Sequence, residues 1–255
     1  MSADSRFSEA RAAVLSEMRS TGGIGTLSEK LLHKILKFYI EPDVSFHEIE
    51  FKKSIADVKN REGIAEIQTR AFERLVPKLE RFLPDVQVLA VLPLVDTKYI
   101  IKIDRESGEF IGRRKSPSHA CINRAACELY KIARFIGHPN FRVKIIFLNF
   151  DEYRYESADG KRRSRSQTLI ECIPSEITSE IDLVCPEDYR IFIPKGLGER
   201  FLASEMQKII GLDSRRTHNT LSLLLSLGLI RRVGKDGRAY IYEIVKGEKS
   251  PLCDR

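Results

Sequence analysis

Hydrophobic residues in the N-terminal part of the chain recur first with helical spacing and then with strand-like spacing. Residues 4–20 have the apolar spacing of a short amphipathic helix, and residues 26–40 repeat an apolar side chain at every fourth position. Residues 46–58 place mostly apolar side chains on one parity and polar side chains on the other, as a half-buried strand requires. The pattern therefore predicts two helices followed by one strand.

The middle of the chain alternates between strand-like and helix-like segments. A turn at 59–63 leads to the extended run IAEIQT, and a helix from about Arg70 to Phe82 comes next. The later expected segments are strands at 86–94 and 98–104 around a turn at 95–97, a basic loop at 112–119, a helix at 118–136, a strand at 142–150, an arginine-rich loop at 154–166 and a strand at 167–174. This order predicts an α/β fold with a mixed central sheet flanked by helices.

The C-terminal part has a different pattern. Residues 201–211 form a short predicted helix ending at Gly211, and the next three residues offer Asp213 or Ser214 as the N-cap of a second helix. This is the spacing of a helix-turn-helix unit. After Gly228, two β-rich segments surround an Asp-Gly turn, which predicts a β-hairpin.

A helix-turn-helix followed at once by a basic hairpin resembles a winged-helix domain over about residues 195–247. The resemblance implies a DNA partner, with the second helix in the major groove and the hairpin on phosphates or in the minor groove. The implied DNA contacts are Arg215, Arg216, Asn219 and Ser222 on the helix, and Arg231, Arg232, Lys235 and Arg238 on the hairpin. The alternative is a module for protein contacts or dimerisation, because fold alone does not determine function.

Two carboxylates are expected to meet upstream of this module. Asp57 closes one strand and Glu66 lies on the next, so a hairpin would place them side by side, and Glu66 and Gln68 would share a face about 7 Å apart. Oxygen ligands of this kind suit Mg²⁺ or Mn²⁺, which can polarise a phosphodiester and activate water. Taken singly, each acidic residue has a simpler interpretation: Asp57 would cap a turn, Glu66 would pair with a lysine, and Glu29 would start a helix.

This set of residues resembles the PD-(D/E)XK nuclease superfamily over about residues 26–150. The likeness is carried by a helix with Glu29, a strand ending in Asp57, and the E-x-Q run of Glu66 and Gln68. It implies that Glu29, Asp57 and Glu66 hold the metal. Gln68 stands where the family has lysine, and Lys78 on the next predicted helix is the candidate for a migrated lysine, so Gln68 or Lys78 would assist the attacking water.

Other residues with suitable chemistry are interpreted more simply. His33 lies four residues after Glu29 and is expected to be a packed or solvated helix residue. The chain has neither a Walker loop nor a nucleophile elbow, which removes support for nucleotide-driven motors and serine hydrolases.

Composition narrows the setting. Lys and Arg number 43 against 36 Asp and Glu, and a net charge of +7 spread along the chain permits a polyanionic partner without requiring one. The five cysteines include no CxxC pair, and the chain has no leader-like segment and no run of eighteen apolar residues. We therefore expect a cytoplasmic protein with no membrane partner, no disulfide and no structural zinc site.

These observations together predict a modular nuclease. The expected parts are an N-terminal helical accessory (1–25), a nuclease-like domain (26–180), a linker (181–194), a winged-helix domain (195–247) and a tail (248–255). The leading hypothesis is a metal-dependent DNA endonuclease, of restriction type or similar, which would be a homodimer if each strand needs its own site. The alternatives are a non-catalytic DNA-binding regulator with a degenerate nuclease-like domain and, less favoured, an RNA-processing enzyme.

Overall fold

Two helices at the N-terminus cover one face of the molecule. The computed structural model describes residues 3–20, 28–117, 121–156 and 168–246. Helices α1 (Ala3–Ser20) and α2 (Ser28–Ile40) bury Phe7, Ile35 and Leu36 against strand residues such as Ile146. Both helices were predicted from the apolar spacing, and both are confirmed.

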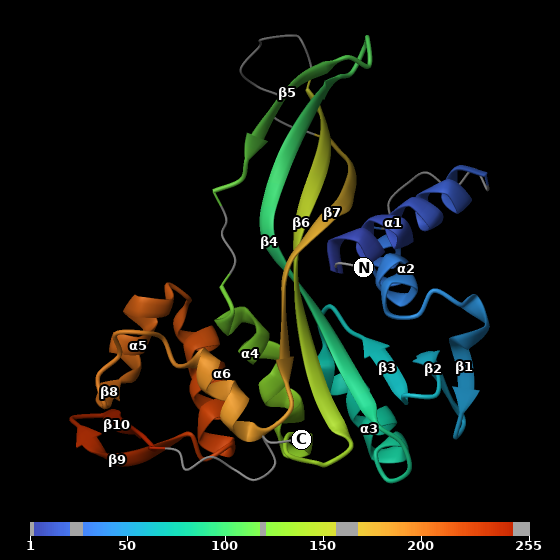
Figure 1. The fold of residues 1–255 in the computed structure, drawn as a ribbon. Helices are drawn as coiled ribbons and strands as arrows, with labels where there is room; N and C mark the ends of the chain where they lie inside the picture. Colours follow the sequence, from blue (N-terminus) through green and yellow to red (C-terminus); the bar gives the residue numbers. More distant parts are fainter. Residues whose placement is uncertain (1–2, 21–27, 118–120, 157–167, 247–255) are drawn as a thin grey trace.

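A large mixed sheet forms the centre of the fold, which confirms the predicted α/β class with a mixed sheet flanked by helices (Figure 1). Its order is β1-β2-β3-β4-β6-β7, with β5 on the outer side of β4. β3, β4 and β6 run parallel, and the other neighbours are antiparallel. The strands are β1 (His47–Phe51), β2 (Ser54–Lys59), β3 (Ile64–Ile67), β4 (Val88–Asp104), β5 (Phe110–Lys115), β6 (Phe141–Glu156) and β7 (Thr168–Leu183).

The single strand predicted for residues 46–58 is wrong, because this segment folds back on itself. Strands β1 and β2 pair as a hairpin in which Phe51 lies opposite Ser54. The two turn residues, Lys52 and Lys53, adopt left-handed conformations with φ of 50° and 59°. Such turns usually contain Asn or Gly, so a Lys-Lys pair gave no sequence signal for the reversal.

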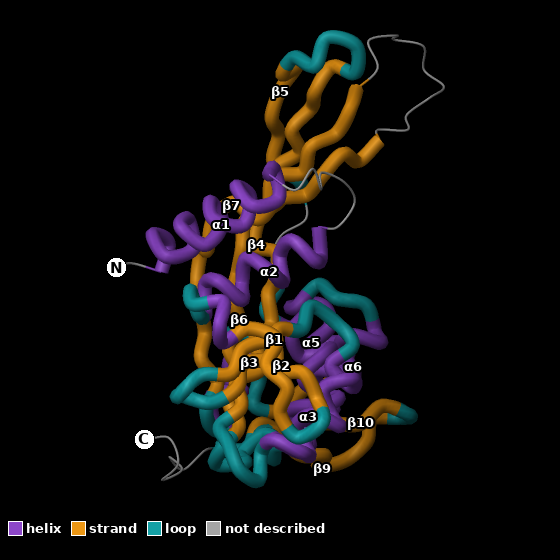
Figure 2. Tube along the Cα trace, turned by 90° about the vertical axis from the view of Figure 1, so that its right-hand side faces the viewer, coloured by secondary structure: helices purple, strands orange, loops and turns teal. Residues whose placement is uncertain are grey.

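The turn predicted at 95–97 is also wrong, because β4 runs through it as one long strand with an irregularity between Val95 and Lys98. The Thr97 N–H donates to Asn149 Oδ1 at 3.0 Å, which satisfies the backbone there. β6 and β7 likewise extend beyond their predicted ends, and residues 112–115 of the expected basic loop lie in β5. The upper halves of β4, β6 and β7, together with β5, form a long β-arm that projects from the body (Figures 1 and 2).

Further helices cover the opposite face of the sheet. These are η2 (Phe72–Leu75), α3 (Val76–Phe82), α4 (Asn123–Leu129), η3 (Tyr130–Phe135) and η4 (Pro186–Phe192). Residues 118–120 of the predicted helix 118–136 lie outside the described residues, and its last part is a 3-10 helix. The segment 181–194, expected to be a linker, contains the end of β7 and η4, and it buries Tyr189 and Phe192.

The C-terminal elements form a second small sheet with two helices. They are β8 (Arg200–Leu202), α5 (Ala203–Ile210), α6 (Ser214–Ser226), β9 (Ile230–Asp236) and β10 (Ala239–Ile244), with strand order β8-β10-β9. As predicted, α5 ends at a left-handed Gly211, and Asp213 caps α6 by accepting the Arg216 N–H at 2.9 Å. Asp236 pairs with Ala239, so the hairpin loop is one residue later than expected.

A single hydrophobic core joins the C-terminal elements to the main sheet. Leu221 and Leu224 of α6 belong to the same buried cluster as Leu129 of α4 and Ile145 of β6. Cys121, Cys127 and Cys172 are free thiols, whereas Cys185 is disulfide-bonded, so the expectation of no disulfide is wrong at that position. Among the described residues, no helix is long and apolar enough to span a membrane.

The β1–β2 turn provides a test of the hairpin. Replacing Lys53 with Gly should raise the free energy of unfolding by roughly 0.5–1 kcal/mol, because glycine removes the strain of a left-handed L-residue. The same Lys→Gly change at the exposed Lys208 of α5 should lower it by about 1 kcal/mol. Urea denaturation of both variants measures the difference, and equal losses would contradict a left-handed turn at Lys53.

Candidate functional site

Two carboxylates lie next to each other where strands β2 and β3 separate. The ladder between these strands includes the pairs Lys59–Ile64 and Val58–Ala65 and stops there. The next two positions along the strands are Asp57 and Glu66. Two like charges directly opposite each other destabilise strand pairing, which accounts for the early end of the ladder.

Asp57 is held by hydrogen bonds from two different elements. Its Oδ2 accepts the backbone N–H of Ile67 at 2.8 Å and lies 3.1 Å from Nε2 of His33 on α2. Burial tends to raise the pKa of Asp57, but the hydrogen bond and charge of His33 and the Ile67 N–H outweigh it, so the pKa lies below its ordinary value. Asp57 therefore stays ionised beside a second carboxyl group.

His33 was interpreted from the sequence as a packed or solvated residue, and the structure instead places it against Asp57. The only sequence signal for this contact was its position one helical turn after Glu29. That spacing puts the two residues on one side of α2, but it does not tell which strand the side faces.

Glu66 is the most deeply buried charged residue of this group. Its side chain is 2% exposed, and Oε2 lies 2.6 Å from Nζ of Lys78 on α3. The other oxygen, Oε1, is buried with no hydrogen-bond partner among the described residues. Burial, and then the charge of Asp57, raise the pKa of Glu66 to about 7, although Lys78 offsets part of this effect.

The expected site is thus assembled in part. Asp57, Glu66 and Lys78 converge, whereas the Gln68 side chain donates to the carbonyl oxygen of Arg70. Glu29 lies in the first turn of α2, but its side chain falls outside the described residues. Among the side chains that the structure describes, no group of three or more His, Cys, Asp or Glu residues is placed to hold a metal ion.

A third carboxylate, Glu48 on β1, occupies the register position opposite Asp57. The flanking pairs His47–Val58 and Ile49–Ala56 are both present in the ladder, while Glu48 adopts a left-handed conformation with φ of 54°. Its Oε1 accepts a hydrogen bond from Nζ of the buried Lys37 at 2.6 Å. Sequence reasoning missed this residue because it fitted the polar parity of the predicted strand.

Helix α6 presents a polar face away from the core. Arg215 and Ser222 are exposed as predicted, and His218, which was not predicted, lies on the same face. Asn219 is half-buried and hydrogen-bonded to Cys127 of α4, so this side of the helix rests on the main body. Arg216 is exposed and forms an ion pair with Asp213 at 3.2 Å.

The basic residues of the hairpin are in different situations. Arg231 is tied down by an ion pair and a hydrogen bond of 2.7 Å to Glu243, which also pairs with Arg200. Arg232 and Lys235 lie over the ring of Tyr240, at 4.3 and 5.0 Å from its centroid. Arg238 is exposed in the turn.

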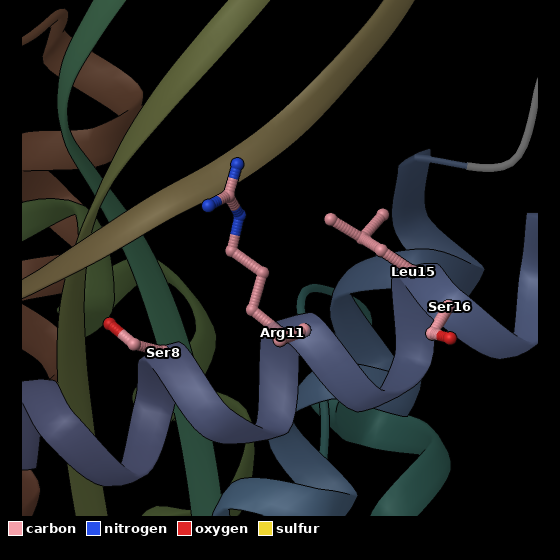
Figure 3. A pocket seen from close by; sticks show the side chains of 5 residues that line it. Ser8, Arg11, Leu15 and Ser16 are labelled. Atoms are coloured by element: carbon pink, nitrogen blue, oxygen red, sulfur yellow. The ribbon is translucent and has the colours of Figure 1, made fainter.

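A hollow of about 390 Å³ lies along α1 and is distinct from the carboxylates (Figure 3). It is lined by Ser8, Arg11, Ala12, Leu15 and Ser16, and the guanidinium of Arg11 points toward the sheet. Arg11 Nε is buried without a hydrogen-bond partner among the described residues. No acidic side chain lines this hollow, so it is unsuited to a divalent cation.

Comparison with known proteins places the chain in a family. Residues 30–184 match the family model described as "Domain of unknown function (DUF8091)". The chain belongs to the DUF8091 family. The match includes His33, Asp57, Glu66 and Lys78 and ends before β8, so the carboxylate site lies within the DUF8091 region and the C-terminal module lies beyond it.

The chain is also similar along most of its length to an "Uncharacterized protein" of Treponema pallidum (strain Nichols). The two are 28% identical over 227 residues, which is 86% of each chain. No solved structure matches this chain. An alignment of this length exceeds residues 1–184, so the similarity to that relative extends past the DUF8091 region into the C-terminal segment.

The raised pKa of Glu66 predicts a pH dependence of stability. Folded Glu66 keeps its proton up to about pH 7, whereas the unfolded chain releases it above its ordinary value of 4.5. In this window the folded state binds more protons, so its stability should fall as the pH rises. Glu66→Gln should remove this loss, which is on the order of 1–3 kcal/mol.

Thermal unfolding of the wild type and of Glu66→Gln between pH 5 and 8 tests this expectation. The exposed Glu50 on β1 provides the control, because Glu50→Gln changes the same chemical group without burial. Parallel pH profiles for the wild type and Glu66→Gln would show that Glu66 is not buried as described.

Proposed function

We propose that this protein is a metal-dependent DNA endonuclease. The observation that carries the proposal is the meeting of Asp57, Glu66 and Lys78 where β2 and β3 separate, with Lys78 Nζ 2.6 Å from Glu66. The helix with Glu29, the strand with Asp57, the strand with Glu66 and the helix with Lys78 follow one another in the layout that the PD-(D/E)XK resemblance implies. Lys78 on α3 supports the proposal that the lysine has migrated from the position of Gln68.

The residues fit a hard divalent cation such as Mg²⁺ or Mn²⁺. Glu66 Oε1 is buried without a partner among the described residues, which costs free energy unless a cation or an ordered water satisfies it. Asp57 and Glu66 supply oxygen ligands, and Glu29 would complete the set from α2. When bound, the ion would polarise the phosphoryl oxygen and favour attack by water.

The chain's own groups would then have separate tasks. His33 and the Ile67 N–H hold Asp57 ionised and oriented. The Lys78 ammonium lies close enough to Glu66 to orient a water molecule and to stabilise negative charge on the phosphate. The side-chain carbonyl oxygen of Gln68 could contribute only if its amide gave up the hydrogen bond to Arg70.

The C-terminal module supports a winged-helix assignment and a DNA partner. Helices α5 and α6 and the β9–β10 hairpin follow the expected order, with the unpredicted strand β8 before them, and the exposed face of α6 carries Arg215 and Ser222. Arg232, Lys235 and Arg238 are exposed on the hairpin and accessible to phosphates. Arg231 is a weaker candidate, because Glu243 already neutralises it.

A DNA-binding regulator without cleavage is the second candidate. The observation in its favour is that Lys78 already pairs with Glu66 at 2.6 Å. In that case α6 and the hairpin would bind DNA, and the carboxylate pair would be a remnant without turnover. The two candidates differ in whether any DNA is cut.

Plasmid cleavage in Mg²⁺ or Mn²⁺ separates the two candidates. The wild type should nick or linearise the plasmid, and Asp57→Asn or Glu66→Gln should reduce the rate at least about a hundredfold, because each removes a charged ligand. Lys78→Met should also lower kcat. Glu50→Gln, on the neighbouring strand, is the control and should cut normally. Cleavage that survives both carboxylate substitutions, or never appears on any DNA form, would overturn the proposal.

Binding of duplex DNA tests the C-terminal module independently. Arg215→Ala should weaken binding by roughly 5–30-fold at low salt, because the exposed guanidinium would lose a phosphate or base contact. Arg61→Ala, in the β2–β3 turn, is an exposed control of the same type. Unchanged affinity of Arg215→Ala in fluorescence anisotropy would count against this face of α6 as the DNA-binding surface.

A further inference from the structure

One face of the β-arm is continuous with the face of the sheet that carries the helix-turn-helix. On β6, Ile145 and Phe147 are buried in the core shared with α3, α4 and α6, while Leu148 and Phe150 pack against α1 and α2. At each irregularity in the pairing, the extra residue belongs to β4 or β7 and not to β6. Successive side chains of β6 therefore alternate regularly between the two faces of the sheet. Tyr153 therefore lies on the same face as Phe147.

Neighbouring strands place further aromatic and basic side chains on this face. Tyr153 lies opposite Ile101 of β4, which lies opposite Arg113 of β5, and Lys115 lies opposite Tyr99. Tyr155 and Phe110 are both opposite Ile103 nearer the tip. We call this set the aromatic platform: Tyr99, Phe110, Arg113, Lys115, Tyr153 and Tyr155.

The part of the aromatic platform nearer the tip is open to solvent, whereas Tyr99 and Tyr153 are half-buried. Phe110 is 66% exposed and Tyr155 is 36% exposed. In Figure 1 the arm extends beyond α4, α5 and α6, and α1 lies across its other side. A cluster of exposed large side chains on a projecting element indicates a binding surface, because burial against the body does not account for it.

One cation of the aromatic platform, Lys115, is unpaired among the described residues, whereas Asp151 and Glu171 lie on the same face, opposite Tyr99 and Tyr153. The guanidinium of Arg113 lies 3.7 Å from the centroid of the Tyr99 ring, in the stacked position of a cation–π contact, and 3.2 Å from Asp151. Lys115 is exposed and forms no ion pair with any described residue. Exposed rings beside an unpaired cation on one β-surface suit the binding of unpaired nucleotides.

We propose that the aromatic platform binds a single-stranded segment of DNA next to the duplex held by the helix-turn-helix. The rings of Phe110, Tyr153 and Tyr155 would stack on exposed bases, and Lys115 would contact a phosphate, whereas Asp151 already neutralises Arg113. Bases in a duplex already stack on one another and offer no free face, so the aromatic side chains favour an unpaired strand. The inference rests on the proposed DNA partner, and it names a junction between duplex and single strand as the substrate class.

Fluorescence anisotropy without metal tests this inference separately from cleavage. The probes are a labelled oligo(dT), a blunt duplex, and the same duplex with an oligo(dT) tail. The wild type should bind the tailed duplex more tightly than the blunt one. Phe110→Ala/Tyr155→Ala should reduce oligo(dT) affinity at least about tenfold and remove the advantage of the tail, while blunt-duplex binding is unchanged.

The arm offers matched controls on its other face. Lys115→Gln should lower the salt dependence of oligo(dT) binding by about 0.7 in log–log slope, whereas Arg114→Gln, which points to the opposite face, should not. Leu169→Ala removes an apolar side chain that is 53% exposed and lies outside the platform, and it should also have no effect.

The possible results distinguish the two proposals. Equal affinity for tailed and blunt duplex, or platform variants that bind oligo(dT) normally, would overturn the inference while leaving DNA cleavage untouched. Normal binding of oligo(dT) by the wild type together with absent cleavage would instead overturn only the catalytic proposal. A change in sedimentation of the Phe110→Ala/Tyr155→Ala variant, with oligo(dT) affinity unchanged, would assign the platform to contacts between copies of the chain.

Discussion

The parallel pairing of β4 with β6 is the constraint on which the rest of the structure depends. The two strands are paired from Val88–Phe141 to Asp104–Glu156 with one irregularity, and their lower halves are buried on both faces. Parallel strands of this kind require helices on both sides, and the two hydrophobic cores supply them. The upper halves extend past the helices, so the same pair that organises the body also forms the arm.

The carboxylate site lies where this regular pairing gives way. β3 pairs with β4 in the parallel part of the sheet. The ladder between β2 and β3 ends one residue before the position at which Asp57 would pair with Glu66. The Ile67 N–H donates a hydrogen bond to the Asp57 side chain instead of to the backbone of a neighbouring strand. A helix on each side then contributes one basic group, His33 from α2 and Lys78 from α3, so two carboxylates can be kept together in a mostly buried position.

Much of the architecture could be predicted from sequence, and the failures have identifiable causes. The spacing of apolar residues was sufficient for α1, α2 and the helix-turn-helix, because each helix buries one stripe. It failed at Lys52-Lys53, where a left-handed turn is made by residues that do not favour one, and at 95–97, where pairing with β6 keeps a turn-like sequence extended. At 95–97 the local preference for a turn is outweighed by pairing with β6, a strand distant in sequence.

The residues of the candidate site likewise divide into those that could be predicted from the sequence and those that could not. Asp57 and Glu66 could be paired from the sequence because a hairpin relates their positions directly, and Lys78 was suggested by the family resemblance. His33 and Glu48 could not, because their roles depend on which side of the sheet α2 packs and on the left-handed conformation of Glu48. Such facts are set by tertiary packing, which local spacing does not encode.

The hydrophobic core that α6 shares with α4 has a mechanical consequence. Because Leu221 and Leu224 are packed into the same interior as the central strands, the helix-turn-helix is built into the body and does not hang from a flexible tether. A protein built this way holds the exposed face of α6 and its carboxylate pair at one separation and one angle. If α6 binds DNA and the carboxylate pair cuts it, as proposed, the DNA would be presented in a single orientation and each cut would fall at a constant offset from the bound sequence.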